Sequence, residues 1–93
     1  MSKLGPDTIV RQSPDVTCRE ISGQTVILTP HNGSVHELDD LGGYIWSLCA
    51  DPVSIGTITD QIVSQYDVER AAAEEDLTSF IGQMIELGAV SEG

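Results

Sequence analysis

Two cysteines and two histidines are the residues of this sequence that could bind a metal ion or act as a nucleophile: Cys18, Cys49, His31 and His36. None of them occurs in a CxxC, HxxxH or HExxH spacing, so we expect no metal site. A cysteine nucleophile needs a nearby base and a positively charged environment, and this sequence is acidic almost throughout. We therefore expect neither a catalytic cysteine nor a cofactor, and we interpret Cys49 as a small core residue.

Acidic and glycine-rich motifs give no catalytic signature either. Glu74, Glu75 and Asp76 are consecutive on an expected helix, so their carboxylates fan around its axis and do not converge on one proton or ion. The Gly42-Gly43 pair matches no phosphate-binding or dinucleotide-binding fingerprint. With His36 interpreted as a half-buried structural residue, we expect a protein that is not an enzyme.

The charge of the chain is strongly negative and unevenly distributed. The 93 residues hold 15 acidic and 4 basic side chains, for a net charge of −11 at pH 7. Arg70 is the one basic residue after position 38, against 11 acidic residues. Binding to nucleic acid or to an anionic membrane depends on Lys and Arg, so we expect neither partner. The negative electrostatic potential of such a chain favours a basic or neutral polypeptide as partner, and the same charge also keeps a small domain soluble.

The length and composition fit one small domain in the cytoplasm. No apolar segment approaches the ~20 residues of a membrane-spanning helix, and two cysteines are too few for a disulfide scaffold. Met1–Asp15 contains two prolines and little periodicity. We expect a flexible N-terminal arm there, followed by one domain over residues 16–90.

The elements that must position any site begin with strands. Val16–Ile21 and Gln24–Thr29 are rich in β-branched residues, and the Ser22-Gly23 pair between them has the spacing of a tight hairpin loop. Asn32-Gly33 is a second hairpin signal, directly before a third strand over Ser34–Leu38. The pattern predicts a three-stranded antiparallel meander in which the third strand lies at an edge.

Three helices follow, where the apolar period changes to three or four residues. The expected ranges are Asp40–Ala50, Ile55–Tyr66 and Glu69–Leu87. Asp39 and Ser54 can cap the first two at their N-termini, and Gly88 stands where a C-terminal cap belongs. Ala89-Val90 fits either a short terminal strand or a frayed end. The fold class is α+β, with a small sheet that must pack one face on the helices.

The order of motifs from the third strand onward resembles the PqqD-like family, which includes pyrroloquinoline quinone synthesis protein D and related precursor-peptide recognition elements. The motifs that carry this resemblance are His36-Glu37-Leu38-Asp39, Gly42, Ile45-Trp46, Pro52-Val53-Ser54-Ile55, Tyr66-Asp67-Val68 and Leu87-Gly88-Ala89-Val90. Asp39 and Ser54 replace the usual asparagine and threonine, and both replacements preserve helix capping. His36 stands where an aromatic residue is frequent.

The resemblance implies a winged-helix-like domain without catalytic activity. Such domains bind the leader of a ribosomally synthesised precursor peptide and present it to a maturation enzyme. That enzyme is a radical S-adenosylmethionine protein in the quinone pathway, and a leader peptidase and cyclase pair in lasso pathways. Nothing in the sequence distinguishes these pathways.

The resemblance also implies a peptide-binding surface formed by the free edge of the third strand and the neighbouring part of the third helix. The candidate residues are Ser34, Val35, His36, Glu37, Leu38, Arg70, Ala73, Glu74 and Leu77. An edge strand can accept an extended peptide by β-augmentation, and it can also pair with its own copy, so a monomer or a weak homodimer is expected. Ala73 and Leu77 fit a groove or plain core packing equally well, and Arg70 can pair with a leader carboxylate or with Glu74.

Other functions fit parts of the pattern. An acidic interaction module or a winged-helix domain with an unrelated partner has the same outline. A DNA-binding winged helix is disfavoured by the acidic helical half. An acyl carrier needs a serine to load at a helix start, and Asp39-Asp40-Leu41 has none.

Overall fold

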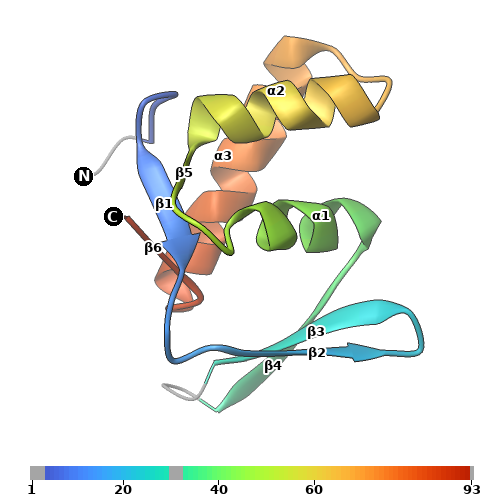
Figure 1. The fold of residues 1–93 in the computed structure, drawn as a ribbon, viewed down its shortest axis with the longest axis vertical. Helices are drawn as coiled ribbons and strands as arrows, with labels where there is room; N and C mark the ends of the chain where they lie inside the picture. Colours follow the sequence, from blue (N-terminus) through green and yellow to red (C-terminus); the bar gives the residue numbers. More distant parts are fainter. Residues whose placement is uncertain (1–3, 30–32, 93) are drawn as a thin grey trace.

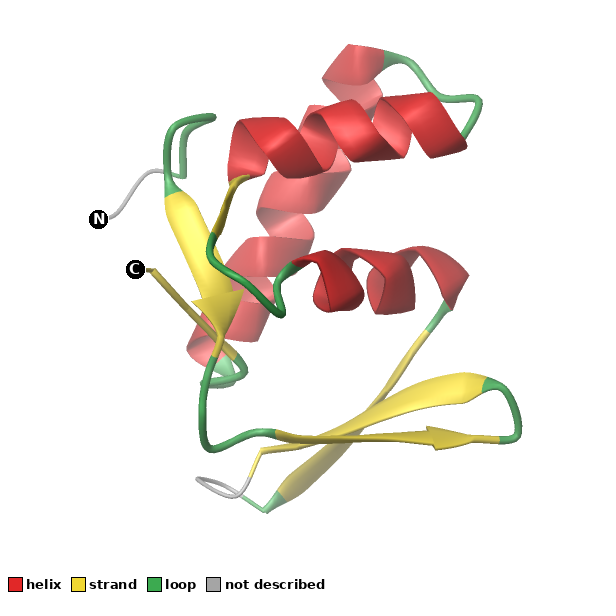
Figure 2. Cartoon of the chain, in the orientation of Figure 1, coloured by secondary structure: helices red, strands yellow, loops and turns green. Residues whose placement is uncertain are grey.

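The computed structural model describes residues 4–29 and 33–92, which form three helices and two small antiparallel sheets (Figure 1). In chain order the elements are β1 (Ile9–Gln12), β2 (Thr17–Ile21), β3 (Gln24–Thr29), β4 (Ser34–Leu38), α1 (Asp40–Leu48), β5 (Val53–Ser54), α2 (Ile55–Gln65), α3 (Arg70–Glu86) and β6 (Val90–Glu92). Figure 2 shows the two sheets as separate groups of yellow strands at two sides of the helices. The expected α+β class and the three helices are confirmed.

The meander β2-β3-β4 has the expected order and the expected strands. Ser22 and Gly23 have φ of 54° and 79°, the two positive values that a type I′ hairpin turn requires. This turn pairs Ile21 with Gln24 and sets the register up to Thr17 opposite Leu28. The second turn is described only at Gly33, whose φ is 65°. Asn32 of the expected Asn32-Gly33 signal lies outside the described residues.

A second sheet, of order β5-β1-β6, was not expected from the sequence. The prediction of a flexible arm over Met1–Asp15 is wrong for residues 9–12, which form the central strand of this sheet and bury Val10 completely. Four residues are too few to show a period, and the partner strands come from positions about 40 and 80 residues later. Of the two alternatives for Ala89-Val90, the terminal strand is the one that forms.

The three expected cap residues, Asp39, Ser54 and Gly88, lie at helix ends. The Asp39 carboxylate accepts the Gly42 N–H at 2.7 Å, and the Ser54 hydroxyl accepts the Thr57 N–H at 3.1 Å. At the end of α3, the Ala89 N–H donates to the Met84 carbonyl and the Gly88 N–H to the Ile85 carbonyl, which is the Schellman pattern around a glycine with φ of 78°. This turn directs the chain from α3 into β6.

The Gly42-Gly43 pair allows α1 to approach its neighbours closely. A Cβ on Gly43 would lie 2.9 Å from Thr25 Oγ1 on β3, and a Cβ on Gly42 would lie 3.3 Å from Phe80 Cε1 on α3. Two glycines cost the helix roughly 1 kcal/mol each relative to alanine. What they permit is a short distance between α1, the meander and α3.

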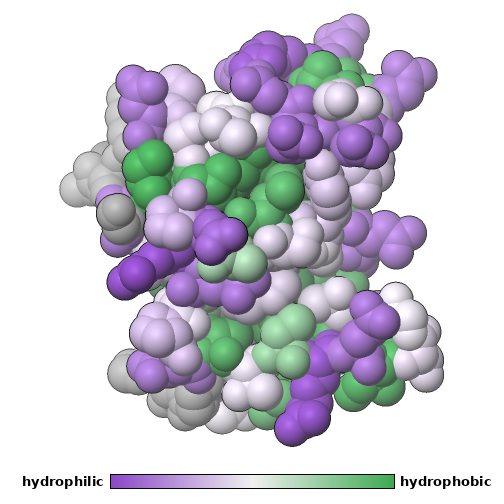
Figure 3. Space-filling model, in the orientation of Figure 1, coloured by the Kyte–Doolittle hydropathy of each residue, from purple (hydrophilic) through white to green (hydrophobic). Residues whose placement is uncertain are grey.

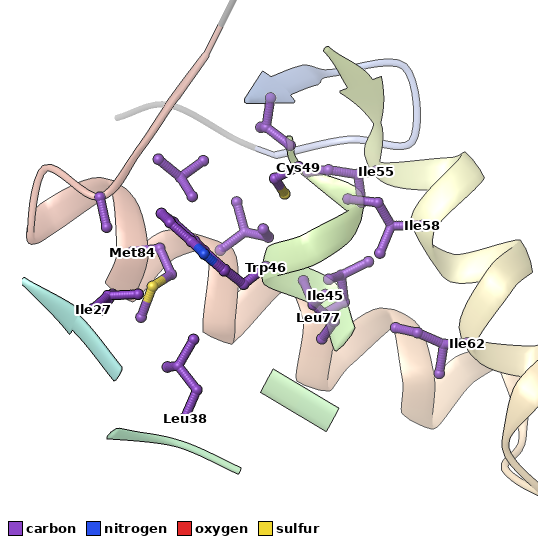
Figure 4. Packing of buried hydrophobic residues seen from close by; sticks show 14 of the residues in the cluster. Ile27, Leu38, Ile45, Trp46, Cys49, Ile55, Ile58, Ile62, Leu77 and Met84 are labelled. Atoms are coloured by element: carbon purple, nitrogen blue, oxygen red, sulfur yellow. The ribbon is translucent and has the colours of Figure 1, made fainter. Parts of the chain in front are cut away.

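One apolar core joins the helices to the meander. Figure 4 shows Ile27, Leu38, Trp46 and Met84 gathered at one end of this core and Ile62 at the other. On the face drawn in Figure 3, apolar residues fill the space between α1 and α2, whereas hydrophilic residues cover the outer side of α2. Within the described part of the chain, no helix is long and apolar enough to cross a membrane.

Candidate binding groove

The edge of β4 is open. Ser34–Leu38 pairs along one side with β3, from Thr29 opposite Ser34 to Thr25 opposite Leu38, and the sheet ends there within the described residues. An edge strand of five residues presents alternate N–H and C=O groups outward, as a template for another strand. The free edge predicted for the third strand is therefore present.

Side chains of β4 alternate as expected between the two faces of the sheet. Val35 and Glu37 are exposed on the outer face, and Val35 retains 59% of its accessible surface. His36 is half-buried and Leu38 is buried, so both point toward the helices. The C-terminal half of the strand thus contributes to the core through Leu38 and borders a surface groove.

A groove of about 430 Å³ separates β4 from the C-terminal half of α3. It is lined by Gln24, His36, Glu37, Leu38, Asp39, Phe80, Gln83, Met84 and Leu87. The wall from α3 is mainly apolar, and the wall from β4 offers backbone groups. An extended chain that lies in this groove can meet both at once.

His36 has an unusual position in this groove. Its Nε2 atom is buried and has no hydrogen-bond partner among the described residues. A buried polar atom left unpaired costs roughly 1–3 kcal/mol. A bound group that reached this nitrogen would recover part of that cost.

The candidate residues of α3, which are Arg70, Ala73, Glu74 and Leu77, do not line this groove. Ala73 and Leu77 are 4% and 0% exposed and belong to the core. Arg70 and Glu74 lie on another side of the helix, beside Pro6 and Gly56. The residues that line the groove from this side come one to three turns later along the chain: Phe80, Gln83, Met84 and Leu87.

Arg70 forms an ion pair with each of two carboxylates. Its Nη2 lies 2.7 Å from Asp60 Oδ1 on α2, and its Nε lies 3.3 Å from Glu74 Oε1. The hydrogen bond to Asp60 and its charge raise the pKa of the guanidinium further above its usual value. The pairing with Glu74 at i+4 was one of the two expected roles, whereas the pairing with Asp60 was not foreseen.

The cysteines have no activating surroundings. Burial raises the pKa of the Cys49 thiol to about 11, so the thiol is protonated at neutral pH. Cys18 is exposed on β2. Among residues 4–29 and 33–92, no group of three or more His, Cys, Asp or Glu side chains could hold a metal ion. His31, which was considered as a ligand from the sequence, lies outside these residues.

Residues 24–90 match the model of a known protein family. The matching family is described as coenzyme PQQ synthesis protein D, or PqqD. No curated protein matches the sequence.

Three solved structures share the fold. The first, TbiB1 in complex with the TbiA(beta) leader peptide, is 28% identical with a TM-score of 0.80, and the alignment covers 87% of this chain and 94% of that one. The second, a lasso peptide synthetase B1 complexed with the leader peptide, is 24% identical with a TM-score of 0.78 over 88% and 96% of the two chains.

The third is the solution NMR structure of the PqqD truncation of Methylobacterium extorquens PqqCD, a stand-alone recognition element for ribosomally synthesised and post-translationally modified peptides. It is 18% identical with a TM-score of 0.78, over 96% of this chain and 95% of that one. At this identity the likeness concerns the fold.

Proposed function

We propose that this chain, which belongs to the PqqD family, binds the leader segment of a ribosomally synthesised precursor peptide as a strand added to β4. The observation that carries the proposal is the open edge of β4 beside a groove whose other wall is the apolar C-terminal half of α3. TbiB1 and the lasso peptide synthetase B1, which share this fold, hold leader peptides.

Backbone pairing gives the interaction its register. Two or three residues of β4 direct their backbone N–H and C=O groups toward the open edge. An added strand therefore makes about four to six hydrogen bonds with β4. At a net value of roughly 0.5–1.5 kcal/mol each, they contribute about 2–9 kcal/mol. Ordering a disordered segment costs about 2–5 kcal/mol, besides the cost of association itself. Hydrogen bonds alone therefore give weak binding.

Apolar contacts with α3 supply the remaining affinity. Phe80, Met84 and Leu87 line the groove opposite β4. Burying about 200 Å² of peptide side chains against them contributes about 5 kcal/mol at 25 cal/mol per Å². Side chains on alternate positions of an added strand point to this wall, so they determine which peptides bind.

The bound leader is then presented to a maturation enzyme in the cytoplasm. This role assigns the chemistry to the partner, either a radical S-adenosylmethionine enzyme or a leader peptidase and cyclase pair, and the chain itself acts without catalysis. The family membership, the two leader-peptide complexes and the stand-alone recognition element that share the fold support this proposal. A protonated, buried Cys49 is consistent with it.

Proline substitution at the two edges of the meander tests the proposal. Random peptides of about twelve residues are displayed and selected on the wild-type protein, and the strongest binder is synthesised and titrated by calorimetry. We expect Glu37→Pro on β4 to lower its affinity at least about thirtyfold, because proline removes a backbone donor and obstructs the edge. The matched variant Glu20→Pro on β2 keeps the affinity within about twofold.

Glu20 and Glu37 are equivalent positions in the ladder. Glu20 pairs with Thr25 and Glu37 with Val26, and these successive residues of β3 direct their backbone groups to opposite neighbours. The backbone N–H and C=O groups of Glu20 and Glu37 thus either both face the open edges of the sheet or both face β3. If both variants lose structure by circular dichroism, the pair His36→Pro and Arg19→Pro tests the alternate positions. Equal affinity of a folded β4 variant and its β2 partner would contradict the proposal.

A further inference from the structure

A second hollow, distinct from the groove, opens between the three helices. Its volume is about 290 Å³, and its walls include Leu41, Ile45, Tyr66, Val68, Leu77 and Phe80. An apolar cavity of about 150 Å³ in another protein is large enough to bind benzene. This pocket therefore has room for one large aliphatic or aromatic side chain.

The pocket has a defined shape. The ring of Tyr66 packs against Tyr44, with their centroids 5.8 Å apart. Phe80 lies close to the start of α1 because Gly42 has no Cβ, which would sit 3.3 Å from the ring. Val68 remains 42% exposed at the rim, so an apolar surface is open to an incoming group.

The pocket and the groove adjoin each other. Asp39 and Phe80 line both of them. Asp39 directly follows Leu38, the last residue of β4. An extended peptide advances about 3.3 Å per residue, so a strand paired with β4 that continues past Leu38 reaches the pocket within a few residues.

The entrance of the pocket is acidic. Asp39 and Asp76 lie on its wall and are both exposed. The Asp39 carboxylate is held in place because it accepts the Gly42 N–H at 2.7 Å. Neither Lys nor Arg is among the residues that line the pocket or the groove. A cation at this entrance would meet carboxylates without a competing internal partner.

We propose that this pocket selects the peptide by taking one large apolar side chain that stands next to a lysine or arginine. This inference rests on the proposed function, since it assumes that the peptide follows β4. The apolar side chain fills the space between the helices, and the neighbouring basic side chain pairs with Asp39 and Asp76 at the rim.

A bulky substitution at the rim of the pocket tests whether the pocket takes an apolar side chain of the peptide. Ala72 and Ala71 are consecutive exposed residues of α3, and only Ala72 lines the pocket. With the strongest synthetic peptide from the selection described above, we expect Ala72→Phe to lower the affinity at least about tenfold. The matched Ala71→Phe variant leaves it within about twofold. Because both positions are exposed, neither substitution disturbs the core.

Charge reversal at the rim tests in the same way whether a basic residue of the peptide pairs with the acidic entrance. Asp76 lines the pocket, and its exposed neighbour Glu75 does not. Asp76→Lys lowers the affinity at least about fivefold, whereas Glu75→Lys, with the same change in net charge, has an effect below about twofold. A peptide whose basic residue is changed to glutamate regains affinity for Asp76→Lys alone.

The outcomes separate the two proposals. If the proline variant on β4 abolishes binding while Ala72→Phe and Asp76→Lys match their controls, the pocket is not a peptide site and the proposed function stands. Selected peptides that share no apolar residue beside a basic one would also overturn the inference. If the proline variant binds normally, or if no peptide is enriched, the proposed function itself fails.

Discussion

The meander has two open edges, and only one of them has the properties of a binding site. All five residues of β2 are exposed, whereas β4 carries exposed, half-buried and buried residues in alternation. Cys18 on β2 and His36 on β4 pair with the same residue of β3, Ile27. Cys18 is exposed, and the Nε2 atom of His36 is buried. Two positions in one row of the sheet, one on each edge strand, thus have different surroundings.

The difference arises from the helices. α1 lies over the meander and packs on β3 and β4 (Figure 1). Residues of α3 line the far side of the groove beside β4. The backbone groups on either open edge can set the register of an added peptide strand. Their hydrogen bonds offset only part of the free energy that it costs to order a disordered peptide. An edge becomes a binding site where an apolar wall stands beside it.

The largest expected effect follows from destabilising the helix that carries that wall. Leu77 is completely buried in α3, so Leu77→Asp places a charge among apolar side chains. We expect the free energy of unfolding to fall by more than about 3 kcal/mol, a large part of the roughly 5–15 kcal/mol typical of a domain. Urea denaturation measures it. The exposed Ser79→Asp on the same helix changes it by less than about 0.5 kcal/mol. A stable Leu77→Asp protein would mean that α3 is not anchored as described.

Chemical labelling compares the two edges within one row of the sheet. In the wild-type protein at pH 7 a bulky maleimide reacts with Cys18, because Cys18 is exposed and the completely buried Cys49 is out of its reach. We expect the label on Cys18 to leave affinity for a selected peptide within about twofold. In a Cys18→Ser, His36→Cys variant, the label at position 36 lowers it at least about tenfold, because it fills the groove.

Mass spectrometry confirms the labelled position, and calorimetry measures the affinity. The unlabelled double variant is the control for the substitution itself. Equal loss of affinity from labels on both strands would show that the two edges do not differ in function.

The smallest effect is expected at Arg70. This residue was a candidate for peptide binding, and its guanidinium pairs with Asp60 and Glu74 away from the groove. Both partners and Arg70 are exposed, so such pairs contribute little. Arg70→Ala is expected to leave peptide affinity within about twofold by calorimetry. A clear loss would mean that the peptide also contacts the first turn of α3.

Local chemistry made the edge strand predictable. The Ser22-Gly23 pair adopts the two positive φ values of a tight hairpin turn, and the β-branched strands around it can pair in one register. Asp39, Ser54 and Gly88 set helix ends through hydrogen bonds to residues at most five positions away. Such features depend on neighbours in the chain, and a sequence displays them directly.

The side of α3 that faces β4 was not predictable in the same way. Ala73, Leu77, Phe80 and Met84 form one apolar stripe, and periodicity cannot tell which part of it is covered by α1 and α2 and which part borders β4. The strand β1 was not predicted for a related reason, because its partner strands are short segments that are distant in the sequence.

The sequence by itself determined that a five-residue strand ends the meander and that three capped helices follow, because turns and caps are decided by groups a few residues apart. Tertiary packing decided which of the two free edges received an apolar wall, and which turns of α3 supply it. That choice depends on how the whole core closes around Ile27, Trp46 and Leu77, and no local pattern contains it.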